Sequence, residues 1–96
     1  MRKAYLLVYD PNTGDRDSVK GILDQMYLID KWRYDMPNCF YIISEYSAEQ
    51  IAKEIREKSD SSGRFIVSQI PANSFGWLTA ESWYLIQNKV YKPKDS

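Results

Sequence analysis

The stretch CFYIISEYSAEQIAKEI, residues 39–55, places a β-strand shortly before an amphipathic helix. Residues 39–43 are a short apolar and aromatic run, which is typical of a buried strand. Ser47 begins a capping box, because its hydroxyl can serve the amide of Gln50 while the side chain of Gln50 reaches back. Apolar residues then recur at helical spacing through Ile55, which predicts a helix.

Two further strands and a helix precede this stretch. Residues 4–9 form another short apolar run, which stops at the turn-forming cluster 10–14. From Asp15 onward the apolar residues follow a helical period, so a helix is expected there. Residues 31–34 alternate charged with aromatic side chains, and a turn at 36–38 joins them to the strand that follows. These last two runs predict an antiparallel hairpin.

A fourth strand follows the second helix. Gly63 is expected to end that helix by adopting a positive φ, and residues 64–70 supply the strand before Pro71. The order strand, helix, strand, strand, helix, strand predicts a four-stranded antiparallel sheet with both helices on one face. Its central strands would be the first and the third. The sequence therefore predicts an α+β fold, the ferredoxin-like βαββαβ plait.

The segment after the fourth strand is less regular. Its first residues, 71–77, are expected to form a loop, after which Thr79 caps a short helix. The core at 4–70, a carboxyl-terminal extension at 71–88 and a polar tail at 89–96 make a single domain of 96 residues.

Composition excludes several classes of function. Thirteen basic residues balance thirteen acidic ones, which argues against a protein whose whole surface grips nucleic acid. There is no histidine, and this removes the commonest general base and the Ser-His and Cys-His arrangements. Cys39 is the single cysteine, so no disulfide framework is expected and the cytoplasm is the expected compartment. Neither a membrane span nor a signal peptide is expected.

Asp10 is the acidic residue placed best for chemistry, because it ends the first central strand where a loop opens. Two such carboxylates facing each other in a dimer would bind Mg²⁺ through oxygen ligands, and the metal would activate water against a phosphodiester. Asp15 and Asp17 would supply further oxygens. The structural alternative is favoured, since turn and cap aspartates greatly outnumber catalytic ones: Asp10 begins an Asx-type turn before Pro11, and the other two lie near a helix start.

The aromatic content is high, with eight tyrosines, three tryptophans and three phenylalanines. Some of these side chains must line a groove or an interface. Aromatics interleaved with cations could stack bases while the cations meet phosphates. We favour the alternative, in which the carboxyl-terminal segment and a second protomer cover the open sheet face. The candidates for binding a nucleic acid or another partner are Lys31, Trp32, Arg33, Trp77 and Trp83.

A homodimer is expected, because a chain of this size gains stability from an extra interface. Lys31 and Arg33 guard the edge of the second strand against pairing. The fourth-strand edge is therefore the expected site of dimerisation. The expected interface residues are Ile66, Ile70, Phe75 and Trp77.

Several stretches together resemble a known family; they are YLLVYD at 5–10, Trp32, SAEQIA at 47–52, GWL at 76–78 and Trp83. They resemble the small bacterial and phage proteins of the SinR family, which is distinct from the helix-turn-helix repressor of that name. Those proteins look like relatives of the CRISPR-associated adaptation endonuclease, the small dimeric ferredoxin-like subunit of the spacer-integration complex. The resemblance runs from Ala4 to about Asn88. It implies a homodimer in which Asp10 matches the aspartate that ends strand one of the endonuclease.

Three classes of function stay open. The first, which we favour, is a non-catalytic dimeric binding or regulatory module that holds a nucleic acid, a nucleotide or a protein. The second is a Mg²⁺-dependent nuclease that uses Asp10 of both protomers. The third is a phage-type inhibitor of a host defence protein, whose aromatic surface is a protein interface. The neutral charge favours the first and third classes, whereas the fold itself separates none of them.

Overall fold

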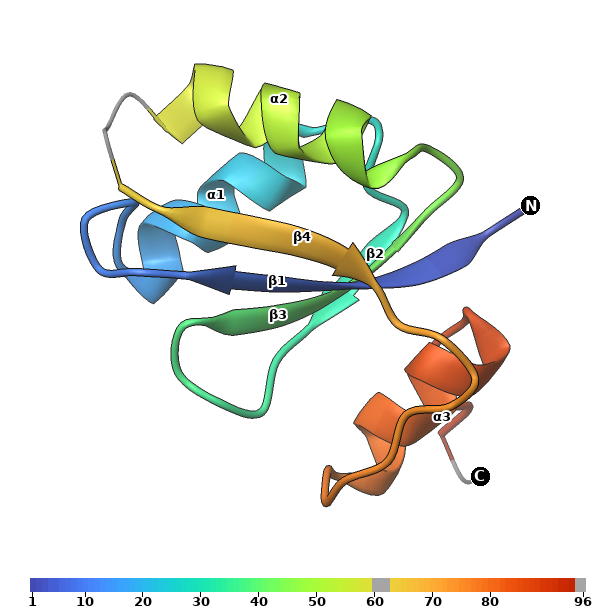
Figure 1. Cartoon of the computed structure of the whole chain (residues 1–96). Coiled ribbons are helices and arrows are strands. Elements are labelled where there is room, and N and C mark those ends of the chain that lie inside the picture. The colour runs from blue at the N-terminus through green and yellow to red at the C-terminus, as the bar shows by residue number, and fades with distance from the viewer. Residues whose placement is uncertain (60–62, 95–96) are drawn as a thin grey trace.

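The computed structural model describes residues 1–59 and 63–94. These residues form β1 (Lys3–Tyr9), α1 (Arg16–Gln25), β2 (Lys31–Arg33), β3 (Cys39–Ser44), α2 (Ala48–Ser59), β4 (Phe65–Gln69) and α3 (Ala80–Asn88). The strands make one antiparallel sheet in the order β2-β3-β1-β4. Helices α1 and α2 cover one face of it, and α3 lies on the other (Figure 1). The expected ferredoxin-like plait is confirmed, with β1 and β3 at its centre.

Side-chain caps begin the two helices that cover the first face. Asp15 caps α1 by accepting a hydrogen bond from the Ser18 N–H at 2.8 Å. At α2 the capping box is reciprocal, because the Ser47 hydroxyl accepts from the Gln50 N–H at 3.1 Å and the Gln50 side chain accepts from the Ser47 N–H at 2.9 Å. Both starts follow from local side-chain chemistry, which is why the sequence located them.

A closed apolar core lies between this face of the sheet and the helices. Phe40 is at its centre and is fully buried. Its ring stacks on Tyr9 at 5.9 Å between centroids and meets Trp32 and Tyr34 edge-on at 5.5 Å. The buried members of the core are Tyr5, Leu7, Tyr9, Val19, Leu23, Met26, Phe40, Ile42, Ile51 and Ile55.

The backbone conformation predicted for Gly63, a positive φ, was wrong. Its φ is not positive, whereas Gly14 does have a positive φ, and the predicted turn at 60–62 lies outside the described residues. Gly63 is instead buried against the loop between β1 and α1. A Cβ added there would meet the backbone of Thr13 and would lie 2.5 Å from the carbonyl carbon of Asn12. Close packing of two backbones therefore requires the glycine.

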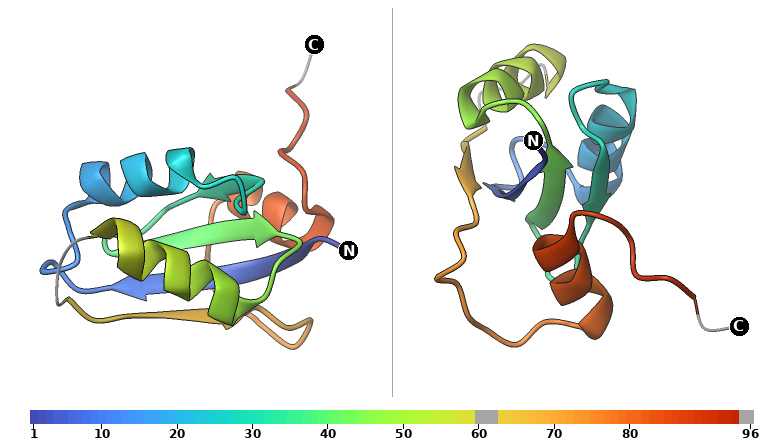
Figure 2. Two further views of the ribbon diagram at one scale, coloured as in Figure 1. Left: turned by 90° about the horizontal axis from the view of Figure 1, so that it is seen from above. Right: turned by 90° about the vertical axis from the view of Figure 1, so that its right-hand side faces the viewer.

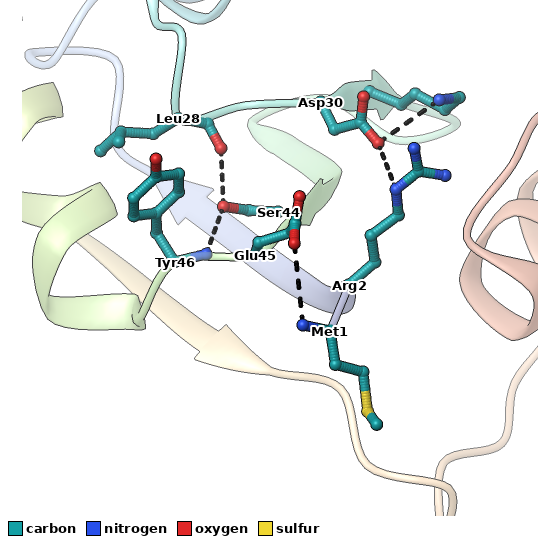
Figure 3. Close-up of polar contacts among 8 residues, drawn as sticks. Met1, Arg2, Leu28, Asp30, Ser44, Glu45 and Tyr46 are labelled. Carbon is teal, nitrogen blue, oxygen red and sulfur yellow. Dashed lines mark hydrogen bonds and ion pairs between the residues drawn. The ribbon is translucent and has the colours of Figure 1, made fainter.

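A group of polar contacts fixes the loop between α1 and β2 to the end of β3 (Figure 3). The buried Ser44 hydroxyl donates to the Leu28 carbonyl at 2.7 Å and accepts from the Tyr46 N–H at 3.0 Å. Arg2 pairs with Asp30 of the same loop at 2.9 Å. The Ser44 contact with Leu28 ties the chain before β2 to the end of β3, and the Arg2 pair ties it to the residue that precedes β1, although β2 itself is only three residues long.

Candidate binding groove

The second face of the sheet is covered only in part. Leu85 and Ile86 of α3 are buried in a cluster that includes Tyr41 of β3. At the other end of the same face, Val8 and Ile66 are 41% and 62% exposed. In the right-hand view of Figure 2 the chain leaves β4, swings away from the sheet and returns to it as α3. The expectation that the carboxyl-terminal segment covers this face is therefore confirmed for one end of it.

A polar network, which we call the latch, holds the start of α3 to the loop between β2 and β3. The Asp35 carboxylate accepts from the Thr79 hydroxyl at 3.1 Å and from the Tyr41 hydroxyl at 3.4 Å. Thr79 caps α3 as the sequence predicted, because its oxygen accepts from the Ser82 N–H at 3.3 Å. The Arg33 Nε donates to the buried Ser82 hydroxyl at 2.8 Å. The contacts of Asp35 with Thr79 and of Arg33 with Ser82 join α3 and its cap to the β2–β3 hairpin. The other two contacts lie within the hairpin and within the start of α3.

The latch sets the charge state of its members. Burial would raise the pKa of Asp35, but hydrogen bonds from Ser82 and Thr79 outweigh this effect and hold that pKa below its ordinary value. Burial, together with the neighbouring Asp35 charge, raises the pKa of Tyr41 well above its ordinary value. The tyrosine is therefore protonated and donates, while the aspartate is ionised and accepts.

An open groove of about 460 Å³ lies between the sheet, the segment that follows β4, and α3. Leu6 and Tyr41 line it from the sheet, and Trp83 and Ile86 line it from α3. Within the part of the chain that the structure describes, no charged residue lines the groove. Groove walls of this kind favour apolar and uncharged side chains, because a charge placed there would lose its hydration without gaining a partner.

Two aromatic side chains stand at the rim of the groove. Phe75 and Trp77 are 87% and 88% exposed, and their rings meet edge-on at 5.3 Å between centroids. Both belong to the irregular segment between β4 and α3, so they add almost nothing to the core of this chain. Large exposed aromatics beside an apolar groove are typical of binding surfaces, where burial of the rings stabilises the complex.

Asp10 lies away from the groove and ties the loop after β1 to the start of β4. One carboxylate oxygen accepts from the N–H groups of Asn12 at 2.8 Å and Thr13 at 3.2 Å. The other accepts from the Arg64 N–H at 3.2 Å. These bonds, led by the one from Arg64, lower the pKa of Asp10. The Asx-type turn expected as the structural alternative is confirmed.

Within a single chain, the residues around Asp10 do not make up a Mg²⁺ site. Both of its oxygens already accept backbone hydrogen bonds, and Asp15 accepts from Ser18 at the start of α1. Within residues 1–59 and 63–94 no group of three or more His, Cys, Asp or Glu side chains could hold a metal ion. The catalytic role of Asp10, and Mg²⁺ as its cofactor, stay predictions from the sequence with no support in this geometry.

The side chains of Lys31 and Arg33 lie on the opposite face of β2 from that of Trp32, although Trp32 and Arg33 both line a shallow hollow at the strand edge. Trp32 packs into the core beside Phe40, and its ring nitrogen donates to Asp24 at 2.8 Å. Successive side chains of a strand alternate between its faces, so Lys31 and Arg33 lie on the side of α3. There Arg33 belongs to the latch, and Lys31 pairs with Asp30 at 3.4 Å. Stacking of a base on Trp32 between these cations is therefore not supported.

The remaining residues expected in an interface occupy different positions on the open face. Ile66 is exposed at the end far from α3, whereas Ile70 is half-buried where β4 runs into the groove. Trp83 is half-buried on α3 and lines the groove. Trp77 and Phe75 are at its rim. Four of these five expected residues thus gather around one groove, although nothing in a single chain tests dimerisation.

Two features of this region were missed from the sequence. The latch was missed because Asp35 and Ser82 are ordinary turn and helix residues whose partnership depends on the tertiary fold. Tyr91 was missed because it falls in the predicted polar tail. Its hydroxyl donates to the Trp32 carbonyl at 3.0 Å and accepts from the Trp32 N–H at 3.4 Å, so this part of the tail lies along β2.

Among the residues that the structure describes, no helix is both long and apolar enough to cross a membrane. No family model, curated protein or solved structure matches this chain. The resemblance to the SinR family therefore stays a prediction, and the groove and the fold carry the functional inference.

Proposed function

We propose that this chain is a non-catalytic binding module that holds a protein partner in the groove below the sheet. One observation carries the proposal: none of the described residues that line the groove is charged, and Phe75 and Trp77 stand almost fully exposed at its rim. Protein interfaces combine a charge-poor centre with aromatic anchors in this way. A regulatory module and an inhibitor of a host defence protein would both need such a surface.

A nucleic acid suits this groove poorly. Phosphates contribute most of the affinity of proteins for nucleic acids and require lysine or arginine beside them. The groove offers neither, and the balanced charge of the chain supplies no general attraction.

Homodimerisation through the same face stays a prediction, which light scattering at micromolar concentration would decide.

Nucleic-acid binding remains the second candidate function, at a different place. Arg33, Lys92 and Lys94 line a hollow beside α3, together with Tyr91. Three cations next to an aromatic ring could hold a phosphate and a base. Glu81 in the same hollow offsets part of this charge, which is why we rank the candidate second.

The test is affinity capture with the purified chain and two variants. In the groove variant Phe75 and Trp77 are both replaced by serine. In the control Tyr27, an 81% exposed tyrosine between α1 and β2, is replaced by serine. We expect one partner protein to be retained by the wild type and the control and lost by the groove variant. A partner that all three proteins retain equally would contradict the proposal.

A parallel titration with labelled single- and double-stranded DNA and RNA separates the other candidates. Binding that survives in the groove variant but is lost when Arg33 and Lys92 are replaced by glutamine would favour the second candidate. Cleavage that requires Mg²⁺ or Mn²⁺ and disappears in Asp10→Asn would instead establish the nuclease. We expect neither.

A further inference from the structure

We propose that the partner binds as an extended segment, which adds a strand to the free edge of β4 and lays one uncharged side chain in the groove. This inference rests on the proposed function and specifies the form of the partner. Addition of a strand supplies affinity through main-chain hydrogen bonds, while side-chain pockets supply selectivity.

The backbone of β4 offers a row of outward hydrogen-bonding groups. The Arg64 carbonyl accepts from the Asp10 N–H at 2.9 Å, and the Ile70 N–H donates to the Ala4 carbonyl at 2.8 Å, so both residues face β1. In an antiparallel pair the facing and outward residues alternate. The outward N–H and C=O groups of β4 therefore belong to Phe65, Val67 and Gln69. Because β4 is the last strand in the sheet order, no strand of this sheet meets them.

The chain covers its other edge, whereas at this one the described residues place cations only at the start of the strand, with Arg64 before Phe65 and Arg56 over the Phe65 ring at 5.0 Å. At β2 the Tyr91 hydroxyl meets both backbone groups of Trp32, and Lys31 adds a charge beside the tyrosine ring. At β4 the sequence Phe65–Gln69 contains no charged residue. Natural sheets commonly guard an edge with charges or a covering segment. A bare edge next to an exposed apolar groove is the arrangement expected where a strand is to be received.

The edge and the groove are continuous. Ser68, Gln69 and Ile70, at the end of β4, also line the groove. A strand placed along β4 would direct every second side chain toward the face that carries the groove. Since the lining is uncharged, the side chain that enters it is expected to be aliphatic or aromatic.

A second copy of this chain fits the edge less well than a partner segment. A symmetric antiparallel pair of β4 strands centred on Val67 would set Arg64 of the second copy opposite Ile70, at an uncharged groove. Centring the pair on Ser68 or Gln69 instead sets Pro71 of the second copy opposite an outward residue, and proline has no N–H to donate. In the registers centred on Val67, Ser68 or Gln69 the edge thus favours a segment with a different sequence over a second copy.

The test uses a phage-displayed library of linear twelve-residue peptides, selected on the wild-type chain. The best peptide is then synthesised in two N-methylated forms, each blocking the amides of alternate residues. A strand on β4 directs only one set of amides at the protein, so one form is expected to lose at least about tenfold in affinity while the other retains it. Enriched peptides are expected to be uncharged and apolar at every second position.

A variant of the protein removes one of the same main-chain hydrogen bonds from the side of β4. Val67→Pro removes one outward N–H, a position where an edge strand tolerates proline, and Tyr27→Ser, outside the groove and the β4 edge, is its control. We expect Val67→Pro, checked for fold by circular dichroism, to weaken the peptide about tenfold and Tyr27→Ser to leave it unchanged.

Three outcomes would overturn the inference. The first is equal binding by both N-methylated forms; if the groove variant still abolished that binding, the proposed function would stand and strand addition alone would fail. The second is a selection that enriches no peptide. The third is a wild-type dimer that Val67→Pro dissociates, because the occupant of the edge would then be a second copy.

Discussion

The two faces of the sheet are built for different purposes. Toward α1 and α2 the strands present a closed core in which Phe40 is fully buried among other aromatic rings. On the opposite face α3 covers one end, while Ile66 and the rim aromatics Phe75 and Trp77 remain exposed. The difference separates stability from binding, since the first face holds the fold together and the second offers apolar surface that the fold does not use.

The comparison predicts that a single truncation on the closed face has the largest effect on stability. Phe40→Ala removes a ring with no exposed surface from the centre of the aromatic cluster, so we expect a loss of about 3–5 kcal/mol in the free energy of unfolding. Urea unfolding followed by circular dichroism measures it. Trp77→Ala is the matched control on the open face and should change stability little. Similar losses of unfolding free energy for both variants would contradict the division of the sheet into a stabilising face and a binding face.

A smaller loss is expected where α3 meets the open face. Leu85 is fully buried, but α3 packs on the sheet from one side only and can relax. For Leu85→Ala we expect a loss of about 2 kcal/mol, at the low end for such substitutions. Hydrogen exchange would show faster exchange in α3 while β1 stays protected. Equal acceleration in both elements would mean that α3 is part of the cooperative core.

The latch is expected to make a pH-dependent contribution to the free energy of unfolding. Asp35→Asn removes the charge that accepts from Thr79 and Tyr41, and we expect a loss of about 1 kcal/mol at neutral pH. The folded pKa of Asp35 lies below its unfolded value, so its stabilisation is complete above the unfolded pKa, near about 4, and disappears as the pH falls through the folded pKa. Wild type and variant should therefore converge in acid. A difference that stays constant in urea unfolding down to the lowest pH at which the wild type is folded would refute this role.

Most of the fold could be predicted from the sequence because its signals are local. The reciprocal bonds of Ser47 and Gln50 and the cap at Thr79 need only neighbouring residues, and the apolar periods distinguish strands from helices. Gly63 shows where this fails, because its need for close packing arises from a loop some fifty residues earlier in the chain. A sequence pattern carries no such distance information.

The candidate site was predicted in part for the same reason. The exposed positions of Phe75 and Trp77 agree with an excess of aromatics that a small core cannot hold. Asp10 and Trp32 are chemically capable residues whose groups already have local partners: backbone amides for Asp10, in the Asx-type turn that the sequence favoured, and Phe40 and Asp24 for Trp32. Whether a functional group is already occupied depends on tertiary contacts and cannot be derived from residue type.

The smallest expected effect on stability comes from one polar atom in the core between the sheet and helices α1 and α2. The Tyr9 hydroxyl is buried and has no hydrogen-bond partner among the described residues, and burial raises its pKa. Since an unpaired buried hydroxyl costs about 1–3 kcal/mol, Tyr9→Phe should leave stability unchanged or raise it by up to about 1 kcal/mol while the ring still stacks on Phe40.

Tyr5 provides the matched control, because it is equally buried in the same core and its hydroxyl donates to the Tyr46 carbonyl at 2.5 Å. Tyr5→Phe should therefore cost about 1 kcal/mol, and the two urea midpoints should move apart. A loss for Tyr9→Phe as large as that for Tyr5→Phe would show that the Tyr9 hydroxyl has a partner, and the closed face would then contain a polar site of its own. The expected separation of the two variants would instead show that, of these two core tyrosines, Tyr5 gains stability from its hydroxyl and Tyr9 from its ring alone.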